Sequence, residues 1–294
     1  MSSFTSQLDI PYGDAQDPRR ALDLYLPAAP PTEAAARPLL VFIHGGAWRS
    51  ESKSDFRETL VPSLLKHTEL PLAVLEYRLS PDSQHPAHLD DVQAGLSLLS
   101  SADDALLPGE QGTPAWNRSH LVLLGHSVGA FMCLQLLLGP PPSGSKASAL
   151  DRRIQSRIEA AFLIDGIYDL PSLLEEYPSY RSFVQEAFGE DAKGAYEVES
   201  PARWPVRSSV LNQTEMHVLH SRQDELLSLA QPHYLLHRLE LARTAALAAA
   251  ATEPDLPPLR PLKVDFEALT GTHDEVVHAN SEALARYVAA AVRR

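Results

Sequence analysis

Short apolar segments alternate with longer helical patterns along almost the whole chain, and this alternation limits the possible folds more than any other feature. The apolar segments are nearly continuous in hydrophobic character, as strands buried on both faces of a parallel sheet are; they span residues 39–45, 72–79, 120–127, 160–169, 215–221 and 261–269. Helical patterns occur at residues 55–67, 88–100, 130–138, 232–250 and 280–294. The sequence therefore predicts an α/β fold with a mostly parallel central sheet and helices on both faces.

The remaining segments predict additions to this sheet. Residues 8–13 and 21–27 alternate apolar and polar side chains, which predicts an antiparallel hairpin at one edge. Residues 102–119, 139–153 and 251–261 are rich in proline, glycine, serine or charge and are predicted to be surface insertions. None of these insertions is long enough to be a domain, so residues 1–294 are predicted to form a single domain.

Charge and composition exclude several classes of partner. The net charge of −13 at pH 7 argues against a surface for nucleic acid or for anionic membrane. Residues 1–20 lack the basic and then apolar pattern of a secretory signal, and no apolar run approaches the roughly 20 residues of a membrane span. Cys133 is the single cysteine, which excludes an internal disulfide and a cysteine-based metal cluster. We therefore expect a cytoplasmic protein that acts on a small molecule.

The sequence Gly125-His126-Ser127-Val128-Gly129 separates a predicted strand from a predicted helix. A serine between two glycines is compatible with an ordinary turn, but this strand–turn–helix context is the one that a nucleophile elbow requires. The turn is so tight that the residues two before and two after the serine must be small, and both are glycine. Ser127 is therefore the predicted nucleophile, and the N–H group of Val128 is a predicted oxyanion donor.

A second glycine-containing motif ends the first core strand. His44-Gly45-Gly46-Ala47-Trp48 has the composition of an oxyanion loop, in which glycines let backbone N–H groups approach a substrate carbonyl closely. Alone it could be an ordinary loop, but it precedes the serine motif in the order that such enzymes show. Gly45 and Gly46 are the predicted donors, with Ala47 as a weaker candidate.

A serine hydroxyl needs a histidine to accept its proton, and that histidine needs an acid to orient it. In this type of fold the chain order is serine, acid, histidine. Asp224 follows the predicted strand at 215–221, and His273 follows the predicted strand at 261–269. Both lie where loops gather at the carboxyl edge of the sheet. The predicted catalytic triad is Ser127, Asp224 and His273.

Nearby polar residues are alternatives to these assignments. Glu225 is adjacent to Asp224 but is expected to point to solvent or to a helix N-terminus. His126 lies inside the elbow, so it can line the pocket but can hardly reach back to Ser127 as a base. Asp274 is predicted to cap a helix. Structural roles are also predicted for His278 and Cys133.

The motifs carry a family resemblance. The segment from Tyr77 to Val92, YRLSPDSQHPAHLDDV, resembles the one that joins the second core strand to a helix in α/β hydrolases of the hormone-sensitive-lipase type. Those esterases typically carry HGGG and GDSAG, whereas this chain has HGGAW and GHSVG. Together with LIDGIYDL at residues 163–170, the HGGXW motif and GHSVG resemble the kynurenine formamidase (arylformamidase) family, its fungal members most closely. The likeness extends from about residue 39 to residue 273.

This resemblance implies an α/β-hydrolase fold and a serine hydrolase acting on a linear amide. The implied reaction converts N-formyl-L-kynurenine to L-kynurenine and formate, a step of tryptophan catabolism toward NAD biosynthesis, without a metal or organic cofactor. It also makes a homodimer plausible. Trp48 and Tyr168 are candidate stacking partners for the aromatic ring of the substrate, with His126 lining the pocket. Both aromatic rings are equally compatible with packing in the core.

Two other functions stay open. A formyl carbon carries only hydrogen and an anilide leaves readily, so the machinery of a general esterase would suffice for this reaction. The motifs therefore do not separate an arylformamidase from a carboxylesterase of the hormone-sensitive-lipase type. A catalytically silent binding protein of the same fold is the third hypothesis, and an intact triad argues against it because binding alone does not require one.

Overall fold

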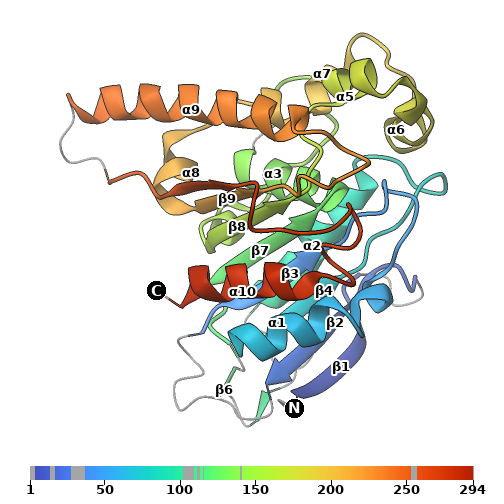
Figure 1. Cartoon of the computed structure of the whole chain (residues 1–294), viewed down its shortest axis with the longest axis vertical. Coiled ribbons are helices and arrows are strands. Elements are labelled where there is room, and N and C mark those ends of the chain that lie inside the picture. The colour runs from blue at the N-terminus through green and yellow to red at the C-terminus, as the bar shows by residue number, and fades with distance from the viewer. Residues whose placement is uncertain are drawn as a thin grey trace.

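The computed structural model describes residues 4–13, 17–27, 37–101, 109–110, 113–114, 116–139, 141–252 and 257–293. Its central feature is an eight-stranded sheet with the order β1-β2-β4-β3-β7-β8-β9-β10 (Figure 1). The bounds of these strands are β1 Phe4–Pro11, β2 Ala21–Pro27, β3 Leu39–Ile43, β4 Leu72–Leu75, β7 Leu121–His126, β8 Ile158–Ile164, β9 Glu215–Leu219 and β10 Leu262–Asp265. A separate two-stranded ladder pairs β5 (Gly109–Glu110) with β6 (Thr113–Pro114).

Strand directions agree with the sequence pattern. Within this sheet, each neighbouring pair among β4, β3, β7, β8, β9 and β10 is parallel. By contrast, β2 is antiparallel to both β1 and β4. The predicted edge hairpin and all six predicted core strands are therefore confirmed, although the strands end earlier than their apolar runs. Residues 44–48 and 165–169, for example, leave the sheet and form loops at its carboxyl edge.

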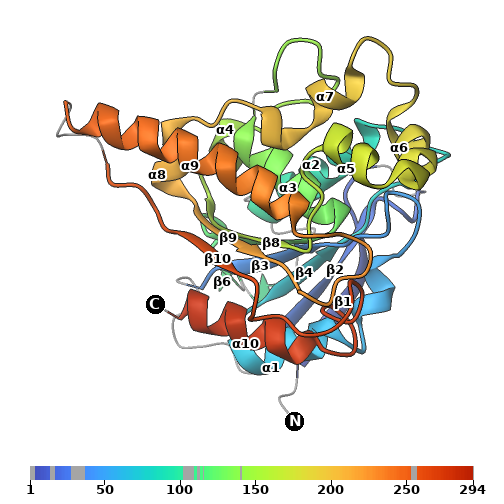
Figure 2. The same cartoon turned by 45° about the horizontal axis from the view of Figure 1, so that its top comes forward.

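Helices cover both faces of the sheet, as Figure 2 shows. One face carries α1 (Leu60–Thr68) and α10 (Ser281–Val292), and the other carries α2 (Ala87–Ser100), α3 (Val128–Leu138) and α9 (Ala230–Ala250). Successive side chains of a strand point to opposite faces. Accordingly Leu40 and Phe42 of β3 belong to the core beneath α1 and α10, while Val41 and Ile43 belong to the core beneath α2 and α3.

The largest difference from the sequence pattern lies between β8 and β9. Four short α-helices occupy this stretch: α5 (Leu170–Glu176), α6 (Arg181–Phe188), α7 (Ala195–Glu199) and α8 (Ser208–Gln213), with two 3₁₀ turns at Pro178–Tyr180 and Pro201–Arg203. Each has only one or two turns, which is too short for a 3.6-residue periodicity to emerge. α5, α6 and α7 gather at one end of the molecule (Figure 1).

The predicted insertions have different outcomes. Of the segment 139–153, the described residues 141–151 are irregular and lead into the one-turn helix α4 (Arg152–Gln155). Most of 102–119 and part of 251–261 lie outside the described residues. Within the described parts of the chain, no helix combines the length and apolar character needed to cross a membrane.

Candidate active site

The turn between β7 and α3 presents Ser127. This residue has φ 54° and ψ −117°, a backbone conformation that residues other than glycine rarely adopt. The surrounding contacts hold it there, because its N–H group donates a hydrogen bond of 2.9 Å to the carbonyl of Ile164. A Cβ atom at Gly125 would lie 2.5 Å from the carbonyl oxygen of Gly129, and one at Gly129 would lie 2.1 Å from that of Ile43. Both glycines are therefore sterically required.

The loop after β3 lies against this turn because β3 and β7 are neighbouring parallel strands. A Cβ atom at Gly45 would lie 2.9 Å from Nδ1 of His126 and 3.1 Å from Cβ of Ser127, so a side chain there would push the loop away from the serine turn. Gly46 has φ 81°, and a side chain there would meet the backbone of Ser50 at 2.1 Å. Among the residues that the structure describes, the N–H groups of Gly46 and Val128 donate no hydrogen bond. They remain free to bind an oxyanion.

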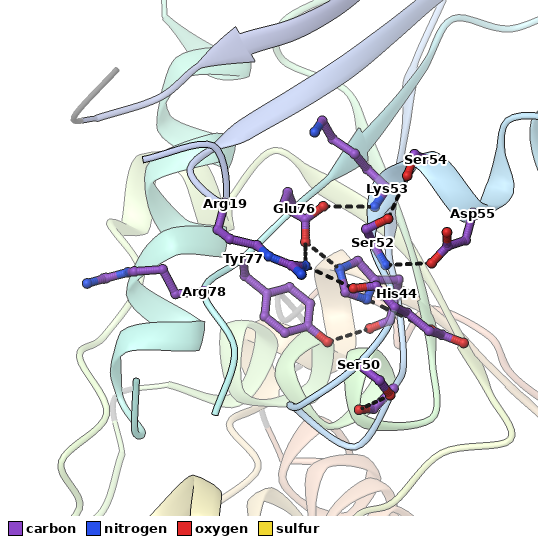
Figure 3. Close-up of polar contacts among 12 residues, drawn as sticks. Arg19, His44, Ser50, Ser52, Lys53, Ser54, Asp55, Glu76, Tyr77 and Arg78 are labelled. Atoms are coloured by element: carbon purple, nitrogen blue, oxygen red, sulfur yellow. Dashed lines mark hydrogen bonds and ion pairs between the residues drawn. The ribbon is translucent and has the colours of Figure 1, made fainter. Parts of the chain in front are cut away.

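Buried polar residues behind the loop fix its shape, as Figure 3 shows. His44 stacks on Tyr77 with ring centroids 4.3 Å apart, and the Tyr77 hydroxyl donates to the carbonyl oxygen of Gly45 at 2.6 Å. Glu76 lies 3.4 Å from His44 and accepts hydrogen bonds from the Arg19 side chain and the Lys53 backbone. Burial would raise the pKa of Glu76, but its contacts with His44 and Arg19 lower it below the usual value. Glu76 is therefore an anionic anchor for the loop.

Asp224 and His273 meet above the ends of β9 and β10. Nδ1 of His273 hydrogen-bonds to Oδ2 of Asp224 at 2.7 Å, and the Asp224 side chain is completely buried. The other carboxylate oxygen accepts from the N–H groups of Leu226 and Leu227, both at 2.8 Å. Burial opposes protonation of His273, but the hydrogen bond and charge of Asp224 outweigh it and raise the pKa. This pair has the geometry of a general base with its orienting acid.

One pocket of about 560 Å³ contains Ser127 and His273 together. Its volume is typical of small-molecule sites. The lining comes from the oxyanion loop, the serine turn, the segment around α6, and the loops after β9 and β10. It consists of Gly46, Ala47, Arg49, Ser50, Glu51, Ser127, Ile167, Ser179, Tyr180, Ser182, Phe183, Leu226, Leu227, His273 and Asp274.

The three side chains suggested as substrate contacts are not among the residues that line this pocket. Trp48 and Tyr168 are buried and do not line it. His126 is also buried, and its Nε2 donates to the backbone carbonyl of His273 at 3.0 Å. Burial lowers the pKa of His126, so the ring stays neutral and holds the loop that carries His273. The aromatic residues that line the pocket are Tyr180, at the end of the 3₁₀ turn Pro178–Tyr180, and Phe183 of α6, and the sequence pattern revealed neither element.

Two further expectations need correction. Glu225, expected to point to solvent or to a helix N-terminus, instead contacts the loop of His273. Its carboxylate accepts a 3.0 Å hydrogen bond from the backbone N–H of that residue. Asp274 is not a side-chain helix cap but lines the pocket. His278 stacks on Phe56 with ring centroids 4.9 Å apart, and Cys133 is buried in α3, so the structural roles predicted for both agree with their surroundings.

Asp165, at the end of β8, is a buried acid that the sequence reasoning missed. Its Oδ1 accepts a 2.7 Å hydrogen bond from the N–H of Ser221. Burial, followed by the nearby charge of Asp224, raises its pKa to about 7. Asp165 forms two groups whose potential metal-ligand atoms lie within 4.8 Å of one another, with His126 and His273 and with His220 and Asp224. Each group shares one member with the hydrogen-bonded pair of Asp224 and His273.

Known proteins are similar to this chain in sequence and in fold. The BD-FAE family matches residues 22–239. Kynurenine formamidase of Eremothecium gossypii is 35% identical over 261 residues, which cover 85% of this chain and 91% of that protein. The chain belongs to the kynurenine formamidase family. Another member, from Saccharomyces cerevisiae, is 32% identical over 213 residues, covering 69% of this chain and 76% of that protein.

The fold of this kynurenine formamidase family member also matches solved structures. A truncated carbohydrate esterase from gut microbiota superposes with a TM-score of 0.71 over 100% of this chain and 98% of that one, at 14% identity. The predicted α/β-hydrolase fold is thereby confirmed. At this level of identity the likeness concerns the fold and not the substrate.

Trp48, the last residue of HGGAW, lies in the hydrophobic core. Its ring packs edge-on against Phe131 and Phe188, with centroids 5.3 and 5.0 Å away. We expect Trp48→Ala to lower the free energy of unfolding by about 3–5 kcal/mol, the usual cost of truncating a large buried aromatic residue. Hydrolysis of formylkynurenine and of a small acetyl ester should fall together. Urea denaturation and kcat/KM for both substrates check this, and selective loss of formylkynurenine turnover with unchanged stability would contradict it.

Proposed function

We propose that this protein hydrolyses N-formyl-L-kynurenine to L-kynurenine and formate through Ser127, His273 and Asp224. The observation that carries the proposal is the 2.7 Å hydrogen bond between Asp224 and His273, in one pocket with a serine on a strained turn, in a chain of the kynurenine formamidase family. The oxyanion donors are the N–H groups of Gly45, Gly46 and Val128.

The first half of the reaction forms a formyl ester on Ser127. Nε2 of His273 accepts the hydroxyl proton while Oγ of Ser127 attacks the formyl carbon, and the negative charge that develops on the formyl oxygen is held by the backbone donors. The carbon–nitrogen bond then breaks, and His273 transfers the proton to the departing aniline nitrogen. Asp224 keeps its negative charge throughout and stabilises the protonated imidazole.

The second half releases formate. Water takes the place of the amine, His273 accepts one of its protons, and the oxygen attacks the formyl ester. The bond to Oγ of Ser127 breaks, and the proton returns to Oγ. The atoms of water balance over the complete cycle. Its oxygen and one hydrogen enter formic acid, and its other hydrogen restores the hydroxyl of Ser127, whose original proton left with the amine.

A competition assay separates this function from that of a general carboxylesterase. We expect kcat/KM for formylkynurenine to exceed that for p-nitrophenyl acetate by a factor on the order of 10², because only the formamide substrate uses the whole pocket. Formylkynurenine should inhibit ester cleavage competitively, and L-kynurenine should accumulate at the same time. Rapid ester cleavage without L-kynurenine production would favour the esterase instead.

We also propose that the enzyme is a homodimer and that it is cytoplasmic. The family likeness supports a homodimer, and the composition supports a cytoplasmic location. Sedimentation equilibrium tests the dimer directly, since a single species of the 32.2 kDa chain mass would contradict it.

A further inference from the structure

The pocket holds three charged side chains that the proposed reaction does not use. Arg49 and Glu51 follow the oxyanion loop, and Asp274 follows the catalytic histidine. An acyl ester or a simple formanilide has no charge for these groups to bind. Their presence beside Ser127 therefore bears on which substrate the pocket selects.

Glu51 is a carboxylate that lacks a hydrogen-bond donor. Its side chain is only 17% exposed, and Oε2 is buried without a hydrogen-bond partner among the described residues. The two imidazoles that face it are too distant for hydrogen bonds, with Nδ1 of His44 at 3.8 Å and Nε2 of His278 at 4.0 Å. Because Oε2 is closed off from solvent, a ligand in the pocket would reach Oε1, which also accepts no hydrogen bond among the described residues. A donor supplied there would stabilise this buried carboxylate.

Asp274 adds a second negative charge beside Glu51. Burial raises the pKa of Glu51, and the charge of Asp274 raises it further, against the opposing effects of His44, His278 and His273. Two neighbouring carboxylates that destabilise each other favour a bound cation. A primary ammonium group suits this place, because it carries one positive charge and three donors.

Arg49 offers the opposite charge at the same pocket. Its side chain is 43% exposed, and its guanidinium lies 3.6 Å from the exposed carboxylate of Glu186, a weak surface pair. The guanidinium also stands 5.7 Å from the centre of the Phe183 ring, which lines the pocket. A planar guanidinium is suited to binding a carboxylate through paired hydrogen bonds.

We propose that Glu51 and Asp274 bind the ammonium group of an aromatic α-amino acid, that Arg49 binds its carboxylate, and that its ring packs against Tyr180 and Phe183. This assignment rests on the proposed function and extends it, because it names the residues that recognise the amino acid end of the substrate. The pocket then selects zwitterionic aryl formamides over uncharged esters by binding charges remote from the scissile bond.

Three formamides that share a 2-formamidophenyl ketone and differ in the charged chain attached to it test this proposal. N-formyl-L-kynurenine carries both the ammonium group and the carboxylate, N-formylkynuramine keeps only the ammonium group, and 2-formamidoacetophenone has neither. All three present the same formyl anilide to Ser127. Rates on the native enzyme are measured first, and then kcat/KM is measured for each substrate with Glu51→Gln, Asp274→Asn and Arg49→Met.

We expect Glu51→Gln to lower kcat/KM for both ammonium-bearing substrates at least about tenfold more than for 2-formamidoacetophenone, the scale of one hydrogen bond to a charged group. Asp274→Asn should act in the same direction and carries the test if Glu51→Gln fails to fold. Arg49→Met should discriminate differently, lowering kcat/KM for formylkynurenine about tenfold more than for formylkynuramine.

Glu175→Gln is the matched control, because Glu175 is an exposed glutamate on α5 outside the pocket lining. Its three rates should keep their native ratios. If Glu51→Gln and Asp274→Asn change all three substrates by the same factor, or none of them, the ammonium site is overturned. The same result with Arg49→Met overturns the carboxylate site. Failure of the native enzyme to hydrolyse formylkynurenine is a separate result, which overturns the proposed function and this inference with it.

Discussion

Ser127→Ala is expected to fold normally and to lose hydrolysis of formylkynurenine by a factor on the order of 10⁶, the scale seen when a triad serine is removed. Ser127 as a residue is 6% exposed, and removing its side-chain oxygen leaves the strained backbone turn and both flanking glycines in place. A melting curve establishes folding, and kcat establishes the loss. Ser97→Ala, at an exposed position on α2, should retain full activity as the control.

Covalent labelling gives an independent test of the same residue. Phenylmethylsulfonyl fluoride should modify Ser127 and no other serine at stoichiometric dose, which peptide mass spectrometry can locate. Labelling elsewhere, or substantial activity in Ser127→Ala, would remove this serine from the mechanism.

Asp224→Asn is expected to lower kcat by roughly 10⁴ because the amide favours the wrong tautomer of the catalytic histidine while leaving its position nearly unchanged. The neighbouring Glu225→Gln should cost little. Its side-chain oxygen can still accept the hydrogen bond from the backbone of His273.

Measuring kcat for both variants on formylkynurenine ranks the two acids directly. A larger loss in Glu225→Gln than in Asp224→Asn would show that the acid has been assigned wrongly. Glu282→Gln, at the start of α10, controls for the general effect of removing one negative charge.

Core strands and the serine turn were predictable because simple physical requirements leave marks in the sequence. Buried parallel strands must be apolar on both faces, and the turn that presents Ser127 must have small residues at Gly125 and Gly129, where a Cβ atom would collide with backbone. The position of a loop after a strand also indicates which edge of the sheet it reaches. Asp224 and His273 could be placed together on this basis alone.

The walls of the pocket were not predictable in the same way. Tyr180 and Phe183 come from helices too short to show a period, and Glu51 looks like any other polar loop residue. Trp48 could not be placed from the sequence either, because a residue beside the oxyanion glycines is equally compatible with contact to substrate and with packing in the core. In the structure the backbone at Trp48 has φ 57°, and its ring lies in the core among Phe131, Phe183 and Phe188.

Asp165, the buried acid that follows β8, makes the free energy of unfolding depend on pH. In the unfolded chain Asp165 loses its proton near pH 3.8, but in the native protein it does so near pH 7. Between these two values the chain takes up a proton at Asp165 as it folds, so this residue weakens the folded state as the pH rises, by about 1.4 kcal/mol per unit. Calorimetry of unfolding in buffers with different ionisation heats should detect this proton, and Asp165→Asn should abolish its share. The protein is thus less stable at neutral pH than it would be without this carboxyl group buried beside Asp224 and His273.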